Sequence, residues 1–372
     1  MEPNDRSVAP KWAFVLLSNT AHPQPSTRIS VLNMLPYLRQ AGVQAEVVFE
    51  PALGSETPNL DGLMERLLAQ RFDLVFFQKV RGASVYACVT DLSKSGIRTV
   101  YGVCDKIDAE MVRLTDRTVV VTEFLRSTCE PAMQHKVHVV HDGIEKPEHA
   151  KQDWGGHVGS RRQPLRAVLV TSANLKHLPV IGDPPDWLSV TIVGHYPANA
   201  EWRNRLRQTQ WALQQAQTWD ARISHLRFLA NRRIVTQQWQ PDSVYAAMLQ
   251  ADIGILPIDT PPALPTDAVL PTWQIKSENR LTLKMAIGLP VIATPIPSYE
   301  PVLAHGHNGF FARSRADWIG CLETLRQPAA RSEIGRQARD SVIDRFSIQA
   351  QARLLLHAVA GDWPPIAPTH TE

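Results

Sequence analysis

The chain has 372 residues, which exceeds one domain of ordinary size and predicts two. Apolar residues make up 44% of it, a normal share for a globular protein with a full core, and the formal net charge is +3. So small a basic excess suits an anionic ligand or a membrane surface but argues against the strongly polybasic nucleic-acid-binding proteins.

Short apolar runs rich in β-branched residues recur through the first 145 residues. Their continuous character is typical of strands in a parallel sheet covered on both faces. Helix-like segments at 28–40, 59–70 and 84–95 separate the early runs, and Pro36 is expected to kink the first segment. This alternation predicts a doubly wound α/β domain over residues 1–150. The expected strands are 12–18, 45–49, 73–78, 98–103, 117–122 and 136–141.

The second half repeats this organisation after a glycine- and proline-containing linker at 146–164. A second α/β domain is therefore expected over residues 160–345. The Trp-rich segment 198–231 is expected to be helical and to shape a pocket or a subunit contact. Residues 329–360 are expected to form two helices that divide near Phe346. The expected strands are 165–171, 189–194, 233–238, 252–258, 289–294 and 309–312.

The four cysteines, Cys88, Cys104, Cys129 and Cys321, are scattered and form no C-x-x-C pair, which favours a reducing compartment. The first apolar run is too short for a signal peptide, and no run approaches the about 20 residues that span a bilayer. We therefore expect a cytoplasmic protein. The histidines show no metal-ligand spacing, so neither a metal nor a cofactor is expected.

The run KSENR, residues 276–280, lies where a proline-rich loop is expected to become a helix. Leu281, Met285 and Gly288 follow at helical spacing, so residues 277–279 fall near the first turn, where backbone N–H groups and the positive end of the helix dipole favour an anion. Lys276 and Arg280 add positive charge there. The alternative is a serine-capped helix start with two solvated cations.

Residues 285–312, MAIGLPVIATPIPSYEPVLAHGHNGFFA, closely resemble the C-terminal half of GT-B glycosyltransferases, especially the retaining group called family four. Further ordered matches at 119–127, 137–147 and 249–257 extend this resemblance along the chain. The resemblance implies two Rossmann-like domains facing a central cleft: an acceptor-binding domain (1–150), a nucleotide-sugar-binding domain (160–345), and a last helix (347–360) that crosses back to the first. The matching residues are Ala286, Gly288, Pro290, Val291, Ile292, Ala293, Glu300, Asn308, Gly309 and Phe310.

One departure from the family concerns the donor. The family places two glutamates eight positions apart, and here Ile275 and Leu283 occupy those positions. The ribose contact of the second glutamate must come from elsewhere, or the donor is held differently. The resemblance makes residues 276–280 the turn that holds the donor diphosphate and nucleotide: Lys276, Ser277, Glu278, Asn279 and Arg280.

The resemblance also points to residues near the donor phosphate and sugar. Lys176, in the loop after the strand at 165–171, is either a phosphate contact or an ordinary surface lysine. Glu300 is expected to face the donor sugar, with Ser298 or Tyr299 sharing that role. The alternative for Glu300 is to cap a helix that begins at Pro301.

In the first domain, Arg28 is expected to begin a helix, where a positive charge opposes the helix dipole. Arg28 is therefore expected to contact either an anion or a carboxylate of its own domain. Asp105 and Asp108 follow the strand at 98–103, at the edge where α/β ligands collect. Asp105 is expected to hold an acceptor hydroxyl or stabilise an oxocarbenium ion, and the alternative is a helix cap.

Taken together, the resemblance implies a retaining, metal-independent glycosyltransferase. It would move a sugar from a nucleotide-sugar donor to a glycan, lipid-linked sugar or small molecule in polysaccharide, glycolipid or glycoconjugate synthesis, with loose contact to the inner membrane face and no nucleic-acid partner. Two alternatives stay open. The lost glutamate pair favours a non-catalytic GT-B scaffold or partner subunit, and the fold also serves nucleotide-sugar epimerases.

Overall fold

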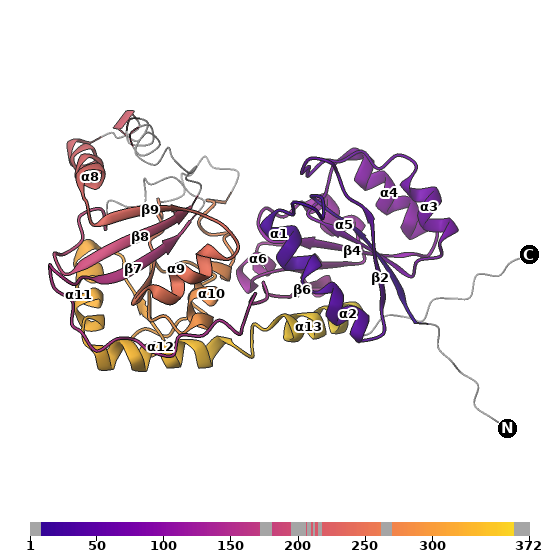
Figure 1. The fold of residues 1–372 in the computed structure, drawn as a ribbon. Coiled ribbons are helices and arrows are strands. Elements are labelled where there is room, and N and C mark those ends of the chain that lie inside the picture. The colour runs from indigo at the N-terminus through magenta and orange to yellow at the C-terminus, as the bar shows by residue number, and fades with distance from the viewer. Residues whose placement is uncertain are drawn as a thin grey trace, which may run out of the picture. The chain divides into compact units, whose positions relative to one another are not determined.

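The computed structural model describes residues 9–171, 181–194, 218–261 and 270–360, together with residues 206, 210, 213 and 214. Its contacts divide the chain into two compact units (Figure 1). Unit 1 comprises Met1–Glu145, Ile275–Ser277 and Phe346–Glu372, and unit 2 comprises Lys146–Gln274 and Glu278–Arg345.

Unit 1 is built on a six-stranded sheet in the order β2-β1-β3-β4-β5-β6, in which every neighbouring pair is parallel. Strands β1, β3, β4 and β5 are almost wholly buried, as β-branched runs without alternation predict, whereas the edge strands β2 and β6 are partly exposed. The strands are β1 (Lys11–Val15), β2 (Gln44–Phe49), β3 (Leu74–Gln78), β4 (Arg98–Val103), β5 (Arg117–Val120) and β6 (Val137–Val139).

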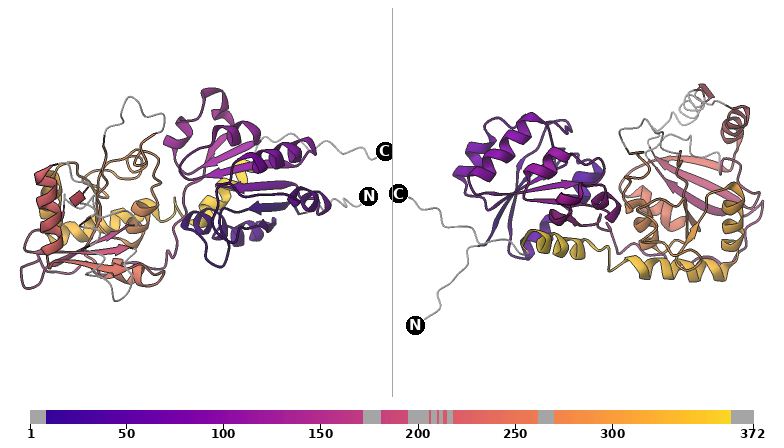
Figure 2. Two further views of the ribbon diagram at one scale, coloured as in Figure 1. Left: turned by 90° about the horizontal axis from the view of Figure 1, so that it is seen from above. Right: turned by 180° about the vertical axis from the view of Figure 1, so that it is seen from behind.

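Helices cover both faces of this sheet. Alternate β3 side chains point to opposite faces, so Val75 and Phe77 join one hydrophobic cluster while Leu74 and Phe76 join the other. Figure 2 shows the helices on the two sides. The first cluster packs under α3 (Leu63–Ala69), α4 (Ala83–Lys94), α5 (Ala109–Leu114) and α6 (Glu123–Ser127), and the second under α2 (Leu35–Gln40) and α13 (Ile348–Ala360). A 3₁₀ turn, η2 (Pro131–Lys136), precedes β6.

The expected single helix over residues 28–40 is not formed. The chain instead makes α1 (Pro25–Thr27), one π-helical turn η1 (Arg28–Leu32) and, after a break, α2. Pro36 lies in the first turn of α2, where a missing N–H removes no helical hydrogen bond. The proline therefore starts a helix here and does not kink one.

Unit 2 carries a second six-stranded parallel sheet in the order β12-β11-β10-β7-β8-β9. One face packs against α8 (Trp219–Ala230), α11 (Arg315–Leu325) and α12 (Pro328–Val342), and the other against α9 (Ser243–Gln250) and α10 (Asn279–Ile287). The strands are β7 (Leu165–Val170), β8 (Leu188–Gly194), β9 (Ile234–Gln238), β10 (Ile253–Leu256), β11 (Val291–Ala293) and β12 (Phe310–Phe311).

The predicted linker at 146–164 packs tightly on unit 2. The Trp154 indole N–H donates to the carbonyl of Gly288, 2.7 Å away, at the end of α10. The buried guanidinium of Arg331, on α12, donates to the carbonyls of Trp154, Gly155 and His157 at 2.7–3.2 Å. These contacts hold the linker across α10 and α12.

Helix α13 belongs to unit 1 although more than 200 residues separate it from the strands it covers. Leu355 and Val359 lie in the second hydrophobic cluster of unit 1. The Gln351 amide oxygen accepts from the backbone N–H of His141 at 2.9 Å, and the Ile144 N–H donates to the Phe346 carbonyl at 2.8 Å. None of the helices in the described ranges is long and apolar enough to cross a membrane.

Candidate functional site

Helix α10 begins at Asn279, within the run 276–280, as expected. Glu278 stands at the N-cap position but makes no side-chain cap hydrogen bond. The helix buries Leu281 and Met285, and Arg280 lies on its first turn. The first backbone N–H groups of a helix point out of its N-terminal end, because no preceding turn supplies their carbonyl partners. Helix α10, of nine residues, has no side-chain cap and carries a cation on its first turn, so its N-terminal end favours the binding of an anion.

Residues 297–302 form a turn after β11 whose Tyr299 responds to the charges at this helix start. Tyr299 is only 1% exposed, and burial raises the pKa of its phenol, while the charge of Arg280 lowers that pKa and the charge of Glu278 raises it. The charges of Arg280 and Glu278 therefore both act on the Tyr299 phenol within unit 2. The neighbouring Ser298 hydroxyl is buried and has no hydrogen-bond partner in the part of the chain that the structure describes.

Glu300 lies in this turn and is exposed to solvent. Residues 301 and 302 continue the turn, so the helix that Glu300 would cap in the alternative interpretation is not present. The structure thus brings Glu278, Arg280 and Tyr299 together within unit 2. Lys276 and Ser277 are grouped with unit 1, and Lys176 lies outside the described residues.

Lys284 is a buried cation beside this helix start that sequence reasoning missed. Its side chain is 0% exposed and extends under Gly254 of β10, and its Nζ donates to the Arg280 carbonyl at 3.4 Å. Burial, followed by the charge of Arg280, lowers the pKa of Lys284 to about 7. The one signal in the sequence is its position four residues after Arg280, on the buried side of α10.

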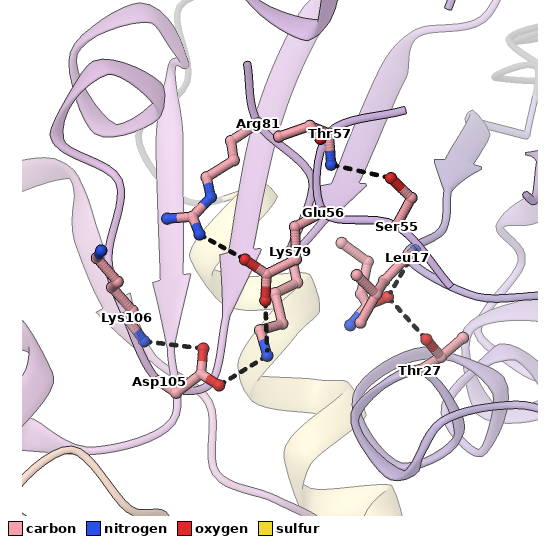
Figure 3. A network of polar contacts seen from close by, with 10 residues as sticks. Leu17, Thr27, Ser55, Glu56, Thr57, Lys79, Arg81, Asp105 and Lys106 are labelled. Carbon is pink, nitrogen blue, oxygen red and sulfur yellow. Dashed lines mark hydrogen bonds and ion pairs between the residues drawn. The ribbon is translucent and has the colours of Figure 1, made fainter. Parts of the chain in front are cut away.

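In unit 1, four charged side chains meet where β-strands end, and we call them the Lys79 cluster: Glu56, Lys79, Arg81 and Asp105 (Figure 3). The Lys79 Nζ lies 2.7 Å from Asp105 Oδ2 and 3.3 Å from Glu56 Oε1. Arg81 Nη2 lies 2.5 Å from Glu56 Oε2. Of these residues, sequence reasoning identified Asp105 only.

Lys79 has a left-handed backbone conformation, with φ of 58°. Its N–H donates to the Gly102 carbonyl at 2.7 Å, and the Arg81 N–H donates to the Glu56 carbonyl at 2.7 Å. Burial lowers the pKa of Lys79, but the hydrogen bond to Asp105 and the nearby negative charges outweigh it and raise the pKa above its ordinary value. Lys79 therefore stays an ammonium ion.

Asp108 and Arg28 have structural partners. Asp108 is the N-cap of α5, because its Oδ1 accepts from the Met111 N–H at 2.9 Å, and its Oδ2 accepts from the Tyr86 hydroxyl at 3.0 Å. Arg28 forms a bidentate ion pair with Glu145, in which Nε lies 2.8 Å from Oε1 and Nη2 lies 3.0 Å from Oε2. The helix cap that was one interpretation of Asp105 is thus made by Asp108, and Arg28 reaches a carboxylate of its own unit.

A small cavity adjoins the Lys79 cluster within unit 1. It lies under η1 and α13, and its lining includes Ser30, Phe76, Cys104 and His141. Burial raises the pKa of the Cys104 thiol, the charge of Asp105 raises it further, and Lys79 opposes this. Among the described residues, no group of three or more His, Cys, Asp or Glu side chains is arranged to hold a metal ion.

No family model and no curated protein matches this sequence. Solved structures do match its fold. HepE of Anabaena, in complex with UDP and glucose, has a TM-score of 0.63 at 11% identity over 94% of this chain and 99% of its own. A Rickettsia africae glycosyltransferase has a TM-score of 0.65 at 12% identity over 95% and 99%. Sucrose-phosphate synthase of Thermosynechococcus elongatus has 0.64 at 12% over 94% and 98%.

These matches span nearly the whole of each chain, and identities this low show the fold only. The two parallel six-stranded sheets, each with helices on both faces, agree with them. The predicted fold class is confirmed: this chain has the GT-B glycosyltransferase fold, with two Rossmann-like α/β units.

Proposed function

We propose that the chain is a glycosyltransferase that uses a nucleotide-sugar donor and retains the configuration of the transferred sugar. The observation that carries this proposal is the start of α10, where Arg280 stands on the first turn without a side-chain cap, beside the buried turn of Ser298 and Tyr299. Its support from outside the chain is the shared fold with HepE, which was solved with UDP-glucose.

The donor diphosphate would bind at the N-terminal end of α10. Its negative charge would meet the helix dipole and the guanidinium of Arg280. The buried Ser298 hydroxyl and the exposed Glu300 carboxylate would hold hydroxyl groups of the donor sugar. The proposed donor contacts are Lys276, Ser277, Glu278, Asn279, Arg280, Lys176, Ser298, Tyr299 and Glu300.

In the proposed reaction, an acceptor hydroxyl attacks the anomeric carbon on the face that the diphosphate leaves. The bond between that carbon and the phosphate oxygen breaks, and the hydroxyl proton passes to the departing phosphate. The protein needs no base of its own for this step and contributes by orienting both substrates and stabilising charge. Asp105 would hold the acceptor, and Arg28 and Asp108 would lie near it.

A thermal-shift screen with UDP-, GDP-, ADP- and dTDP-sugars tests this proposal. One nucleotide sugar at about 100 times its Kd should stabilise the wild type by about 2.7 kcal/mol. Lys276→Ala/Arg280→Ala should lose that shift, whereas Arg161→Ala/Arg162→Ala, which removes two exposed cations elsewhere in unit 2, should keep it. If none of the four classes shifts the wild type at millimolar concentration, the transferase proposal is wrong.

The scaffold alternative is favoured by one specific observation, the apolar residues Ile275 and Leu283 at the positions of the family's two glutamates. Binding does not separate it from catalysis. Release of free nucleotide from the bound nucleotide sugar does, because a transferase hydrolyses its donor slowly in the absence of an acceptor. A nucleotide sugar that binds, yet releases no nucleotide over hours even with added saccharides, would favour the scaffold.

A further inference from the structure

We propose that the Lys79 cluster binds a neutral, polyhydroxylated sugar as the acceptor, and that Lys79 is the positioning residue that fixes the two carboxylates for it. This inference rests on the proposed transferase function and adds to it the chemical class of the acceptor. The cluster joins three loops of unit 1, because Glu56 follows β2, Lys79 and Arg81 follow β3, and Asp105 follows β4. Ligands of doubly wound sheets bind at this carboxyl edge of the strands.

The backbone at Lys79 is the first argument for a specific role. A non-glycine residue with φ of 58° is strained, and such strain gathers at functional sites. Its N–H is held by the Gly102 carbonyl, and the conformation directs the ammonium between two carboxylates. A glycine would accept this backbone more readily but would leave both carboxylates without their shared partner.

The second argument is the number of hydrogen bonds that the carboxylates can still accept. Asp105 accepts a hydrogen bond from the Lys79 ammonium at Oδ2 and another from the backbone N–H of Lys106 at Oδ1. Glu56 accepts a hydrogen bond from Arg81 at Oε2, and its Oε1 forms an ion pair of 3.3 Å with the Lys79 ammonium. A carboxylate accepts about four hydrogen bonds, so each has about two left. Both side chains are 38% exposed, and a ligand can reach them.

The charges of the cluster decide the class of ligand. Two cations balance two carboxylates, and the Lys79 side chain is only 16% exposed because its ammonium is engaged with both of them. The cluster itself therefore offers carboxylate oxygens and holds its two cations in ion pairs, while the exposed Lys106 stands outside it. Hydroxyl groups donate to such oxygens, whereas a phosphate or carboxylate would meet lone pairs of the same sign. A neutral sugar fits this surface and an anionic one does not.

Saturation-transfer NMR on the full chain tests the inference without nucleotide. The probes are methyl glycosides of glucose, galactose, mannose and N-acetylglucosamine, each compared with the corresponding sugar 1-phosphate. We expect the wild type to bind at least one glycoside more tightly than its phosphate. Lys79→Met should weaken that binding at least tenfold, and Lys79→Arg should restore part of it. The matched control Lys106→Met removes an exposed neighbouring cation and should change nothing.

A merely structural role would give a different result. Asp105→Asn keeps the shape of the side chain and should also weaken glycoside binding, so the test survives if Lys79→Met does not fold. In turnover with the donor, Lys79→Met should raise the KM for the glycoside and leave the nucleotide-dependent thermal shift unchanged. Equal glycoside binding by wild type, Lys79→Met and Asp105→Asn overturns the inference, as does tighter binding of the sugar phosphates or no glycoside binding at all. A wild type without any nucleotide-dependent shift would instead refute the transferase proposal.

Discussion

Lys284 shows what a single buried charge does to a folded unit. The side chain is fully buried in unit 2, and its ammonium donates a hydrogen bond of 3.4 Å to the Arg280 carbonyl. Burial disfavours the charged form, so the pKa of Lys284 falls from its ordinary 10.5 to about 7. Between these values the unfolded chain binds a proton that the folded chain does not. Acidification across this window therefore destabilises the fold, and below about pH 7 the effect is complete.

We predict that Lys284→Met stabilises the protein by an amount that depends on pH. The gain should be small at pH 10 and grow by about 1.4 kcal/mol for each pH unit down to pH 7, because methionine has no proton to exchange. Thermal unfolding of both proteins from pH 6 to 10 measures it. Lys94→Met, at a side chain that is 72% exposed on α4, is the control and should show no such trend. A constant difference across this range would mean that Lys284 keeps its ordinary pKa.

The residues that sequence reasoning missed have one property in common. Lys79, Lys284 and Arg331 derive their roles from tertiary packing. Lys79 and Arg331 contact partners that are distant in the sequence, and Lys284 is buried on the core side of α10, four residues from its partner Arg280. The pairing of Lys79 with Glu56 joins loops 23 positions apart, and Arg331 reaches carbonyls 174–177 positions away. Local spacing carries no signal for such contacts. The start of α10 within the run 276–280 could be predicted because helical spacing is local.

At the scale of elements, the close packing of the linker on α12 depends on Gly335. A Cβ added to Gly335 would lie 2.2 Å from the Trp154 indole nitrogen and 2.4 Å from the Gly288 carbonyl oxygen. Neither atom can move without breaking the hydrogen bond between them. Gly320, on α11, is exposed and has no atom within 4 Å of the same position. The two sites share helical backbone and differ in their surroundings.

Replacing each glycine by alanine should therefore give opposite results. Gly335→Ala should destabilise by about 1–3 kcal/mol through overpacking. Gly320→Ala should stabilise by about 0.5–1 kcal/mol, since alanine loses less backbone freedom in a helix. Urea unfolding followed by tryptophan fluorescence measures both. If Gly335→Ala is as stable as wild type, the linker does not pack on α12 as described.

All twelve strands could be predicted from the sequence, because buried parallel strands leave continuous β-branched runs. The parallel sheets and the GT-B fold followed from their order and from the matching motif at 285–312. The interrupted helix at 25–40 could not be predicted, since its π turn depends on packing over the second cluster of unit 1. The roles of the predicted site residues remain predictions until ligands are bound.

At the scale of the whole molecule, unit 1 is completed by the end of the chain. Leu355 is 1% exposed and packs with residues of β1, β3 and α2, whereas its neighbour Leu354 is 41% exposed. Leu355→Ala should cost unit 1 about 2–5 kcal/mol, and Leu354→Ala should change its stability little. Hydrogen exchange of the β1 and β3 amides reports this directly. Equal protection in both variants would show that α13 does not support the sheet.

The position of α13 also has a consequence for how the protein is made. The ribosome delivers the strands of unit 1 first, and residues 146–345 must follow before Phe346 emerges. At about 5–20 residues per second, this delay is on the order of 10–40 s. During it, the apolar face that Leu355 and Val359 later cover stays exposed to solvent. Unit 1 therefore cannot finish folding while it is being translated, and unit 2 is synthesised completely before unit 1 can close.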